Sequence, residues 1–313
     1  QVRVVEFVYY DGMVFSEGGT IGIPEVLVWK SEAQGPGRDS MIDWVTYLLA
    51  QSWWEDQLIA ADVAGGMTLR ESLSAYSSQL YLRSQRTPEQ QVRAQQQRMR
   101  EFFRSLGKID FQEPPLIDIY NELPIARHKG GMILELIEDL IGQDALLTGI
   151  RQFLADQRYQ SAPYTTVLDL RDAILARADT ENQRDAIENL FAEVVTYQVG
   201  VADAVFAPRP DGRYDVRLTL EAQQFQTSGL GQQRAMPLNL PVTIELTDET
   251  NQPIEVVRPV LSEAQTTITL VTDERPTFAA VDPEYKLPSA YLQDNVKRLR
   301  LDETEGAEVS ELN

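Results

Sequence analysis

The hydrophobic pattern of this chain changes its period twice along the sequence. Residues 1 to 30 alternate apolar and polar side chains between glycines, a pattern typical of two or three short strands. From about Asp39 to Thr196 the apolar residues recur at helical spacing, and from Tyr214 to Val281 short alternating segments return. Helix-forming and strand-forming stretches in separate parts of one chain predict an α+β fold.

The helical part is divided by glycines and prolines. Asp39 or Ser40 is a candidate N-cap for the first helix. Thr68 and Glu71 have the spacing of a capping box at the start of the second, and Pro88 suits the first turn of the third. The helices are expected at about 39–53, 68–85, 89–106, 123–141, 143–158, 165–178 and 182–195.

The strand-forming part predicts a small antiparallel β-sandwich, because short alternating segments follow one another with turn residues between them. These segments lie at 214–220, 242–246, 254–257, 267–270 and 277–281. We therefore expect a mostly helical domain at residues 1–198, the sandwich at 199–290 and a C-terminal tail at 291–313. The acidic run at 302–305 in that tail is expected to be solvated.

The charge of the chain is strongly acidic, with a formal net charge of −20 at pH 7. Binding to nucleic acid requires clustered lysines and arginines, and here 48 acidic residues outnumber 28 basic ones. The same balance argues against docking on anionic lipid, and it is typical of a soluble surface. No apolar run reaches the roughly 18 residues of a membrane span. The chain opens without a signal-peptide pattern and is expected to be a piece of a longer protein.

Histidine and cysteine are nearly absent, which limits the chemistry available. The chain contains one histidine, His128, and no cysteine. A catalytic zinc site usually takes several imidazole or thiolate ligands, which this composition cannot supply. A Ser-His-Asp triad using His128 remains arithmetically possible, but no Gly-x-Ser-x-Gly elbow accompanies it. We expect His128 to be an ordinary structural or surface residue, and we expect no cofactor.

Two segments at a fixed distance carry a family resemblance. Residues 43–54 read Asp-Trp-Val-Thr-Tyr-Leu-Leu-Ala-Gln-Ser-Trp-Trp, and residues 69–76 read Leu-Arg-Glu-Ser-Leu-Ser-Ala-Tyr. Taken alone, the tryptophan pair indicates core packing. Together, the two segments resemble the aminopeptidase-N-like zinc peptidases, the gluzincins, and most of all the branch associated with bacterial ABC-transporter permeases. That branch has a helix reading His-Glu-x-Ala-His-Gln-Trp-Trp, followed by a Leu-x-Glu-Ser-Leu-x-x-Tyr stretch.

The catalytic positions of that motif are changed in this chain. In the resembling enzymes the two histidines, four residues apart on one helix face, bind zinc together with the later glutamate. Tyr47 and Gln51 stand at the histidine positions here, and Leu48 stands at the position of the general base. Only the third ligand position is retained, as Glu71. The resemblance therefore implies a degenerate metal site without a proton acceptor.

Two further positions extend the comparison. The family has a Tyr-x-Lys-Gly motif whose tyrosine stabilises the oxyanion, and this chain reads Arg-His-Lys-Gly at 127–130, so that tyrosine is replaced by Arg127. The family also binds the substrate's amino terminus through a glutamate. Glu25, in the segment Ile-Gly-Ile-Pro-Glu at 21–25, matches it, although the glycine that follows it in the family is missing. Segments 281–285 and 294–296 resemble Ile-Asp-Pro and Asp-Asn signatures of the transporter-linked branch, so the likeness covers nearly the whole chain.

The resemblance implies the C-terminal part of a thermolysin-like, gluzincin catalytic domain followed by a β-sandwich. Without zinc, the carboxylate of Glu71 needs another positive partner if it is buried. Our hypothesis is that Arg127 forms an ion pair with Glu71 or Glu25, and the alternative is that Arg127 points to solvent.

We expect a non-catalytic domain that binds peptide through Glu25, Glu71 and Arg127 or assembles a membrane transporter. The resemblance implies a parent tethered to a bacterial membrane, on its extracytoplasmic side. The alternative is an active metallo-aminopeptidase or other hydrolase with a non-standard site, in which Glu71 holds another metal with Asp56 or Asp62. A chance resemblance to an unrelated protein is the third reading.

Overall fold

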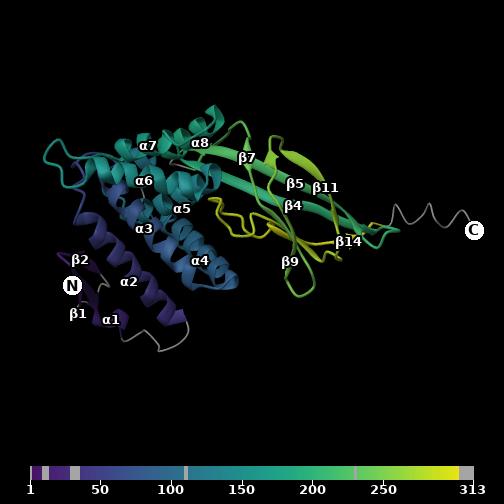
Figure 1. Ribbon diagram of the computed structural model, residues 1–313, viewed down its shortest axis with the longest axis horizontal. Coiled ribbons are helices and arrows are strands. Elements are labelled where there is room, and N and C mark those ends of the chain that lie inside the picture. Colours follow the sequence, from purple (N-terminus) through teal and green to yellow (C-terminus); the bar gives the residue numbers. More distant parts are fainter. Residues whose placement is uncertain (1, 9–13, 29–35, 109–111, 229–230, 303–313) are drawn as a thin grey trace, which may run out of the picture. The chain divides into compact units, whose positions relative to one another are not determined.

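The computed structural model describes residues 2–8, 14–28, 36–108, 112–228 and 231–302 (Figure 1). It contains both helices and strands, so the expected α+β class is confirmed. The chain divides into two compact units, Gln1–Ala94 with Glu101–Val194, and Gln95–Arg100 with Val195–Asn313. The expected boundary at residue 198 falls inside a strand of the second unit.

The first unit is mainly helical. Every helix expected from the sequence is present, and its ends agree with the expected ones or differ by up to three residues. Its elements are β1 (Arg3–Phe7), β2 (Phe15–Glu17), β3 (Thr20–Pro24), α1 (Glu25–Val28), α2 (Pro36–Glu55), α3 (Gly66–Gln85), α4 (Pro88–Leu106), the 3-10 helix η1 (Leu116–Asp118), α5 (Leu123–Ile141), α6 (Gln143–Gln157), α7 (Val167–Leu175) and α8 (Glu181–Ala192).

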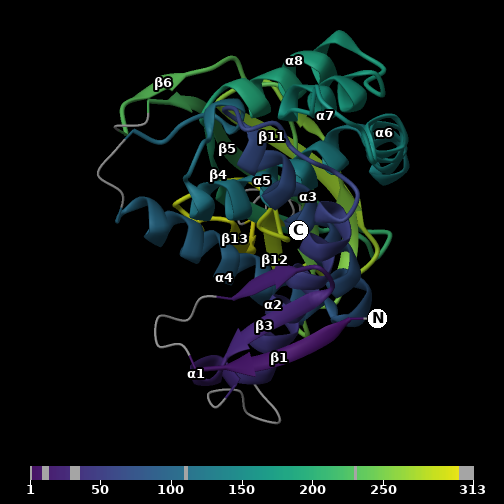
Figure 2. The same ribbon diagram turned by 90° about the vertical axis from the view of Figure 1, so that its left-hand side faces the viewer.

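A small sheet packs against α2 in the first unit (Figure 2). Its central strand β3 pairs in parallel with β1 and antiparallel with β2. Ile21 and Ile23 of β3 are buried against Tyr47 and Leu48 of α2. Burial of these apolar side chains fixes the rotation of α2 about its axis, because its apolar face must meet the sheet.

The start of α3 differs from its expected capping. The helix begins at Gly66, its N-cap residue Gly65 has φ of 80°, and no side chain caps it. Thr68 is already inside the helix, and its hydroxyl donates to the carbonyl of Leu116 at 2.7 Å. The capping box expected from Thr68 and Glu71 is therefore wrong. The left-handed turn at Gly65, which glycine adopts readily, starts the helix two residues earlier.

Helices α3 and α5 lie side by side (Figure 1) and approach closely through glycines. A Cβ at Gly130 would meet Ser72 Oγ at 1.9 Å, and one at Gly131 would meet the Cβ of Ala75 at 2.9 Å. Further along the pair, Glu138 of α5 accepts a hydrogen bond from Tyr76 Oη at 2.7 Å. The glycines at 130 and 131 thus let the middle of α5 approach the middle of α3.

The second unit consists of strands, most of them antiparallel, together with residues 95–100 of α4. One sheet has the order β11-β5-β4-β14 with β6 beside β5, a second has the order β13-β12-β8-β9, and β10 pairs with β7. The strands are β4 (Val195–Pro208), β5 (Tyr214–Thr227), β6 (Gln233–Ala235), β7 (Leu240–Pro241), β8 (Ile244–Thr247), β9 (Pro253–Val257), β10 (Val260–Leu261), β11 (Gln265–Thr272), β12 (Phe278–Val281), β13 (Val296–Arg298) and β14 (Arg300–Leu301).

Strand β4 is the main element that the sequence pattern does not predict. The pairing of β4 with β5 shifts register between Val201 and Asp203. Such an irregularity breaks the period-2 alternation that marks a strand in sequence. Much of β4 is also buried without regular alternation. An apolar run of this kind cannot be distinguished from a buried helix by its period alone.

The two C-terminal segments that resemble family signatures contact each other. Asn295 Nδ2 donates to the carbonyl of Val281 at 2.9 Å, and the N–H of Val281 donates to Asn295 O at 2.8 Å. Residues 296–298 and 300–301 form β13 and β14, where a tail was expected from residue 291. Asp302 is paired with Arg217 and its side chain is only 9% exposed, so it is not solvated as expected. Residues 303–313 lie outside the described residues.

Candidate functional site

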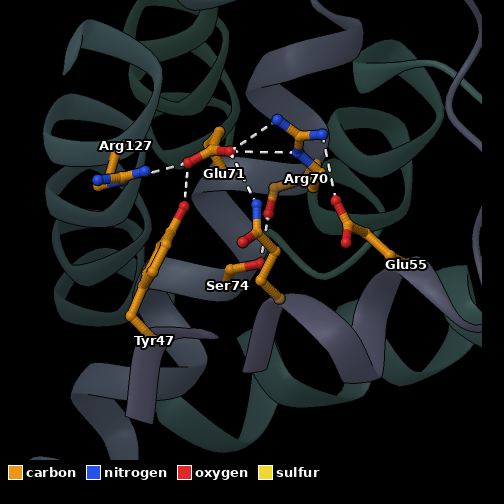
Figure 3. Close-up of polar contacts among 7 residues, drawn as sticks. Tyr47, Glu55, Arg70, Glu71, Ser74 and Arg127 are labelled. Carbon is orange, nitrogen blue, oxygen red and sulfur yellow. Dashed lines mark hydrogen bonds and ion pairs between the residues drawn. The ribbon is translucent and has the colours of Figure 1, made fainter. Parts of the chain in front are cut away.

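Glu71 is the centre of the polar cluster in the first unit (Figure 3). It lies on α3, which packs against both α2 and α5, and its exposed fraction is 0%. A carboxylate removed from water in this way is strongly destabilising unless positive charge and hydrogen-bond donors surround it. The contacts of its two oxygens therefore decide what the site can do.

Tyr47 and Gln51 reach Glu71 from α2. Tyr47 Oη donates a hydrogen bond to Glu71 Oε2, and Gln51 Nε2 donates to Glu71 Oε1 at 3.2 Å. Their four-residue spacing places both side chains on the helix face that meets α3. The structure thus brings together the three positions that the sequence aligns with zinc ligands. Leu48, at the position of the general base, is buried in the apolar cluster with Ile21.

Arg127 reaches Glu71 from α5. Its Nε lies 3.3 Å from Glu71 Oε2. The guanidinium carbon also lies 4.5 Å from the ring centroid of Tyr47 and 4.9 Å from that of Trp44. Both distances are within the range of a cation–π contact. The expected ion pair between Arg127 and Glu71 is confirmed, and the alternative of a solvent-directed Arg127 is wrong.

Arg70 supplies a second positive charge that the sequence pattern does not predict. Its Nε and Nη2 lie 3.1 and 3.0 Å from Glu71 Oε1, and its Nη1 lies 3.1 Å from Glu55 Oε1 (Figure 3). Neighbouring residues on a helix point about 100° apart, so position alone does not suggest that Arg70 bonds Glu71. The sequence does place Arg70 beside Glu71, in the helix that follows the one containing Glu55, and this is the signal that could have indicated the contact.

The electrostatic surroundings keep the phenol of Tyr47 neutral. Burial, and then the negative charge of Glu71, raise the pKa of Tyr47 well above its ordinary value. Burial also raises the pKa of Glu55, although Arg70 opposes that shift. Burial alone would lower the pKa of Arg70, but the charges of Glu71 and Glu55 outweigh it, and the pKa of Arg70 is raised. Both Tyr47 and Arg70 therefore keep their protons and donate hydrogen bonds at neutral pH.

This donor set does not fit zinc. Zinc requires ligands that offer lone pairs, whereas a protonated phenol, an amide nitrogen and two guanidinium groups all present hydrogens to Glu71. Within the described ranges, no group of three or more histidine, cysteine, aspartate or glutamate side chains is close enough to hold a metal ion. Asp56 and Asp62 are exposed and do not join Glu71 in such a group.

The remaining residues singled out in the sequence lie apart from this cluster. Glu25 opens α1 and is half-buried, and no hydrogen bond or ion pair joins it to Glu71 or Arg127 in the part of the chain that the structure describes. His128 is half-buried. Lys129 is almost fully buried, and its Nζ lies 2.7 Å from Glu113 Oε1. Burial lowers the pKa of Lys129, and the charge of Glu113 opposes the shift.

Comparison with protein-family models and with curated proteins finds no match to this chain. The resemblance to zinc aminopeptidases therefore rests on the residues and spacings given above. Among the described helices, none is both long enough and apolar enough to cross a bilayer.

Proposed function

We propose that this chain is a non-catalytic peptidase-like domain related to the transporter-associated zinc aminopeptidases. The observation that carries the proposal is the position of Glu71 between Arg127 and Arg70. Two guanidinium groups provide the positive charge that a metal ion would otherwise provide to a buried carboxylate. In this interpretation the first unit corresponds to the C-terminal part of a gluzincin catalytic domain, and the second unit corresponds to the β-sandwich that follows it.

Peptide hydrolysis on such a scaffold needs an activated water and a stabilised oxyanion. Leu48 is aliphatic and cannot accept a proton from water. The phenol of Tyr47 is already hydrogen-bonded to Glu71, and its raised pKa opposes ionisation. Each residue that would have to hold or activate water is thus either apolar or already engaged with Glu71, which favours a binding or assembly role.

The proposed role is to bind peptide or to hold together parts of a membrane transporter on the extracytoplasmic side of a bacterial membrane. Of the candidate peptide-binding residues, Glu71 and Arg127 neutralise each other. Glu25 is therefore the residue that we propose to bind the amino terminus of a peptide.

A direct test is hydrolysis of aminoacyl fluorogenic substrates by the full chain, with and without added zinc. We expect no turnover above background, and we expect Glu71→Gln to leave that background unchanged. Stoichiometric zinc together with turnover that disappears in Glu71→Gln would establish the alternative, an active metallo-aminopeptidase. Turnover that persists in Glu71→Gln would indicate a hydrolase that works at another site.

A further inference from the structure

A cavity of about 470 Å³ lies beside Glu71 and shares Arg70 and Glu55 with the polar cluster around that carboxylate. It is formed by the end of α2, the segment that follows it, the start of α3 and the region of Tyr120. Trp54, Leu58, Leu69 and Leu73 contribute apolar wall, whereas Glu71, Tyr47 and Arg127 do not line it. Its volume lies within the range of about 300–1,000 Å³ found for small-molecule sites.

Charged side chains also line this cavity. Among its described lining residues, Arg70 is the only basic one, and Glu55 and Asp62 are acidic. All three nitrogens of the Arg70 guanidinium group already contact carboxylates, Nη1 with Glu55 and Nε and Nη2 with Glu71. An anionic ligand would therefore have to compete with two existing ion pairs for Arg70.

The two acidic residues keep acceptor capacity. Glu55 accepts from Arg70 through Oε1, and Asp62 accepts from Tyr120 Oη through Oδ1 at 3.0 Å. Across the described residues, no hydrogen bond or ion pair engages Glu55 Oε2 or Asp62 Oδ2. A carboxylate oxygen has room for more than one donor, so both groups can accept from a ligand in the cavity.

We propose that this cavity binds an organic cation that carries a primary ammonium group on an apolar body. The ammonium group donates to Glu55 and Asp62, and the apolar body packs against Trp54 and the leucines. Burial raises the pKa of Glu55, and a cation beside its carboxylate opposes that shift. The net charge of −20 favours approach of a cation at long range. This site does not depend on whether the Glu71 cluster is catalytic.

The charge selectivity of the cavity tests this inference. Hexylamine, hexanol and hexanoate have the same apolar chain with a positive, neutral and negative head group at neutral pH. Isothermal titration calorimetry with the full chain should show saturable binding of hexylamine, weaker binding of hexanol and no binding of hexanoate. Equal binding of hexanoate, or no binding of hexylamine, would overturn the inference.

Variants locate the binding site. Glu55→Gln and Asp62→Asn should each weaken hexylamine binding about fivefold, as expected for one partly exposed charge pair. Asp56→Asn is the matched control, because Asp56 is an exposed neighbour that does not line the cavity. If all three variants bind hexylamine as the original chain does, the assignment is wrong. Because Asp62 is exposed, its variant keeps the test valid even if Glu55→Gln unfolds.

One more probe distinguishes two kinds of ligand that carry an ammonium group, a lysine side chain and a small free amine. An N-acetylated, C-amidated Leu-Lys-Leu tripeptide presents a lysine ammonium group at the end of an apolar side chain between two leucines and has no free amino terminus. Binding of this peptide in competition with hexylamine would assign the cavity to a lysine side chain of a peptide or protein. Binding of hexylamine alone would assign it to a small free amine.

Discussion

At the residue scale, the defining feature is the number of donors that converge on Glu71. The sequence predicts Arg127 as a partner because the family resemblance places that residue beside the carboxylate. It does not predict Arg70 or Trp44. The contact of Arg70 with Glu71 depends on the direction that its side chain takes at the start of α3. The contact of Trp44 with Arg127 arises because α2 and α5 both pack against α3. Spacing along a helix identifies a shared face, but it does not identify which long side chain turns toward a buried charge.

Replacement of Arg127 should reveal the energy that its ion pair contributes. Arg127→Gln leaves fully buried Glu71 with Arg70 as its cation, and we expect the free energy of unfolding to fall by about 2 kcal/mol. Urea unfolding measures this change. Arg171→Gln is the matched control, because Arg171 pairs with the exposed Asp172 and should change stability by about 0.5 kcal/mol or less. Equal effects of the two variants would contradict an electrostatic role for Arg127.

The phenol of Tyr47 should give a measurable pH dependence. Because the pKa of Tyr47 is raised in the folded state, its contribution to stability is complete below the unfolded value of about 10 and declines as pH rises above it. We expect Tyr47→Phe to be less stable by about 1–2 kcal/mol at neutral pH, from the lost hydrogen bond to Glu71. The stability difference between the original chain and Tyr47→Phe should then shrink from about pH 10 to about pH 11.

Urea unfolding over this pH range provides the measurement. Burial also raises the pKa values of Tyr76 and Tyr197, but both residues are present in the two proteins, so their contributions cancel in the difference. Two stability curves that remain parallel above pH 10 would mean that Tyr47 ionises as readily in the folded chain as in the unfolded one.

At the element scale, the sequence predicts the helices well and the strands unevenly. Helices are marked by glycine and proline at their ends and by apolar faces, as in α5 and α6 on either side of Gly142. Strand β4 is missed because its bulge between Val201 and Asp203 interrupts the alternation. Likewise, β14 pairs with β4 over a long sequence separation, and no local pattern at residues 300–301 predicts this pairing. Helix signals are local, whereas strand signals depend on distant partners.

The close approach of α3 and α5 should depend on Gly130. An alanine in an open helix position usually stabilises a helix relative to glycine by about 0.5–1 kcal/mol. At Gly130, however, the added methyl group would overlap Ser72, so we expect Gly130→Ala to lower the free energy of unfolding by about 2 kcal/mol. The same change should move Arg127, three residues earlier, away from Glu71.

Gly107→Ala is the matched control for this prediction. Gly107 has φ of −66° at the end of α4, and a Cβ there would make ordinary contacts at 3.6 Å or more. Urea unfolding of both variants should therefore show a loss for Gly130→Ala and no loss for Gly107→Ala. A Gly130→Ala variant as stable as the original chain would mean that the two helices do not need a glycine between them.

At the scale of the whole molecule, the acidity of the chain affects any experiment on metal binding. A net charge of −20 attracts divalent cations to the surface without any dedicated site. Such binding is weak, increases with cation concentration and is screened by salt. Binding at Glu71 would instead saturate at one ion per chain and disappear when Glu71 is replaced.

The central claim is that Arg127 and Arg70 take the place of a metal ion at Glu71. The most direct measurement is calorimetric titration of zinc into the full chain and into Glu71→Gln, at an ionic strength of about 0.15 M that screens surface charge. We predict the same weak, unsaturable heats from both proteins. A saturable site for one zinc ion in the original chain, absent from Glu71→Gln, would contradict the claim.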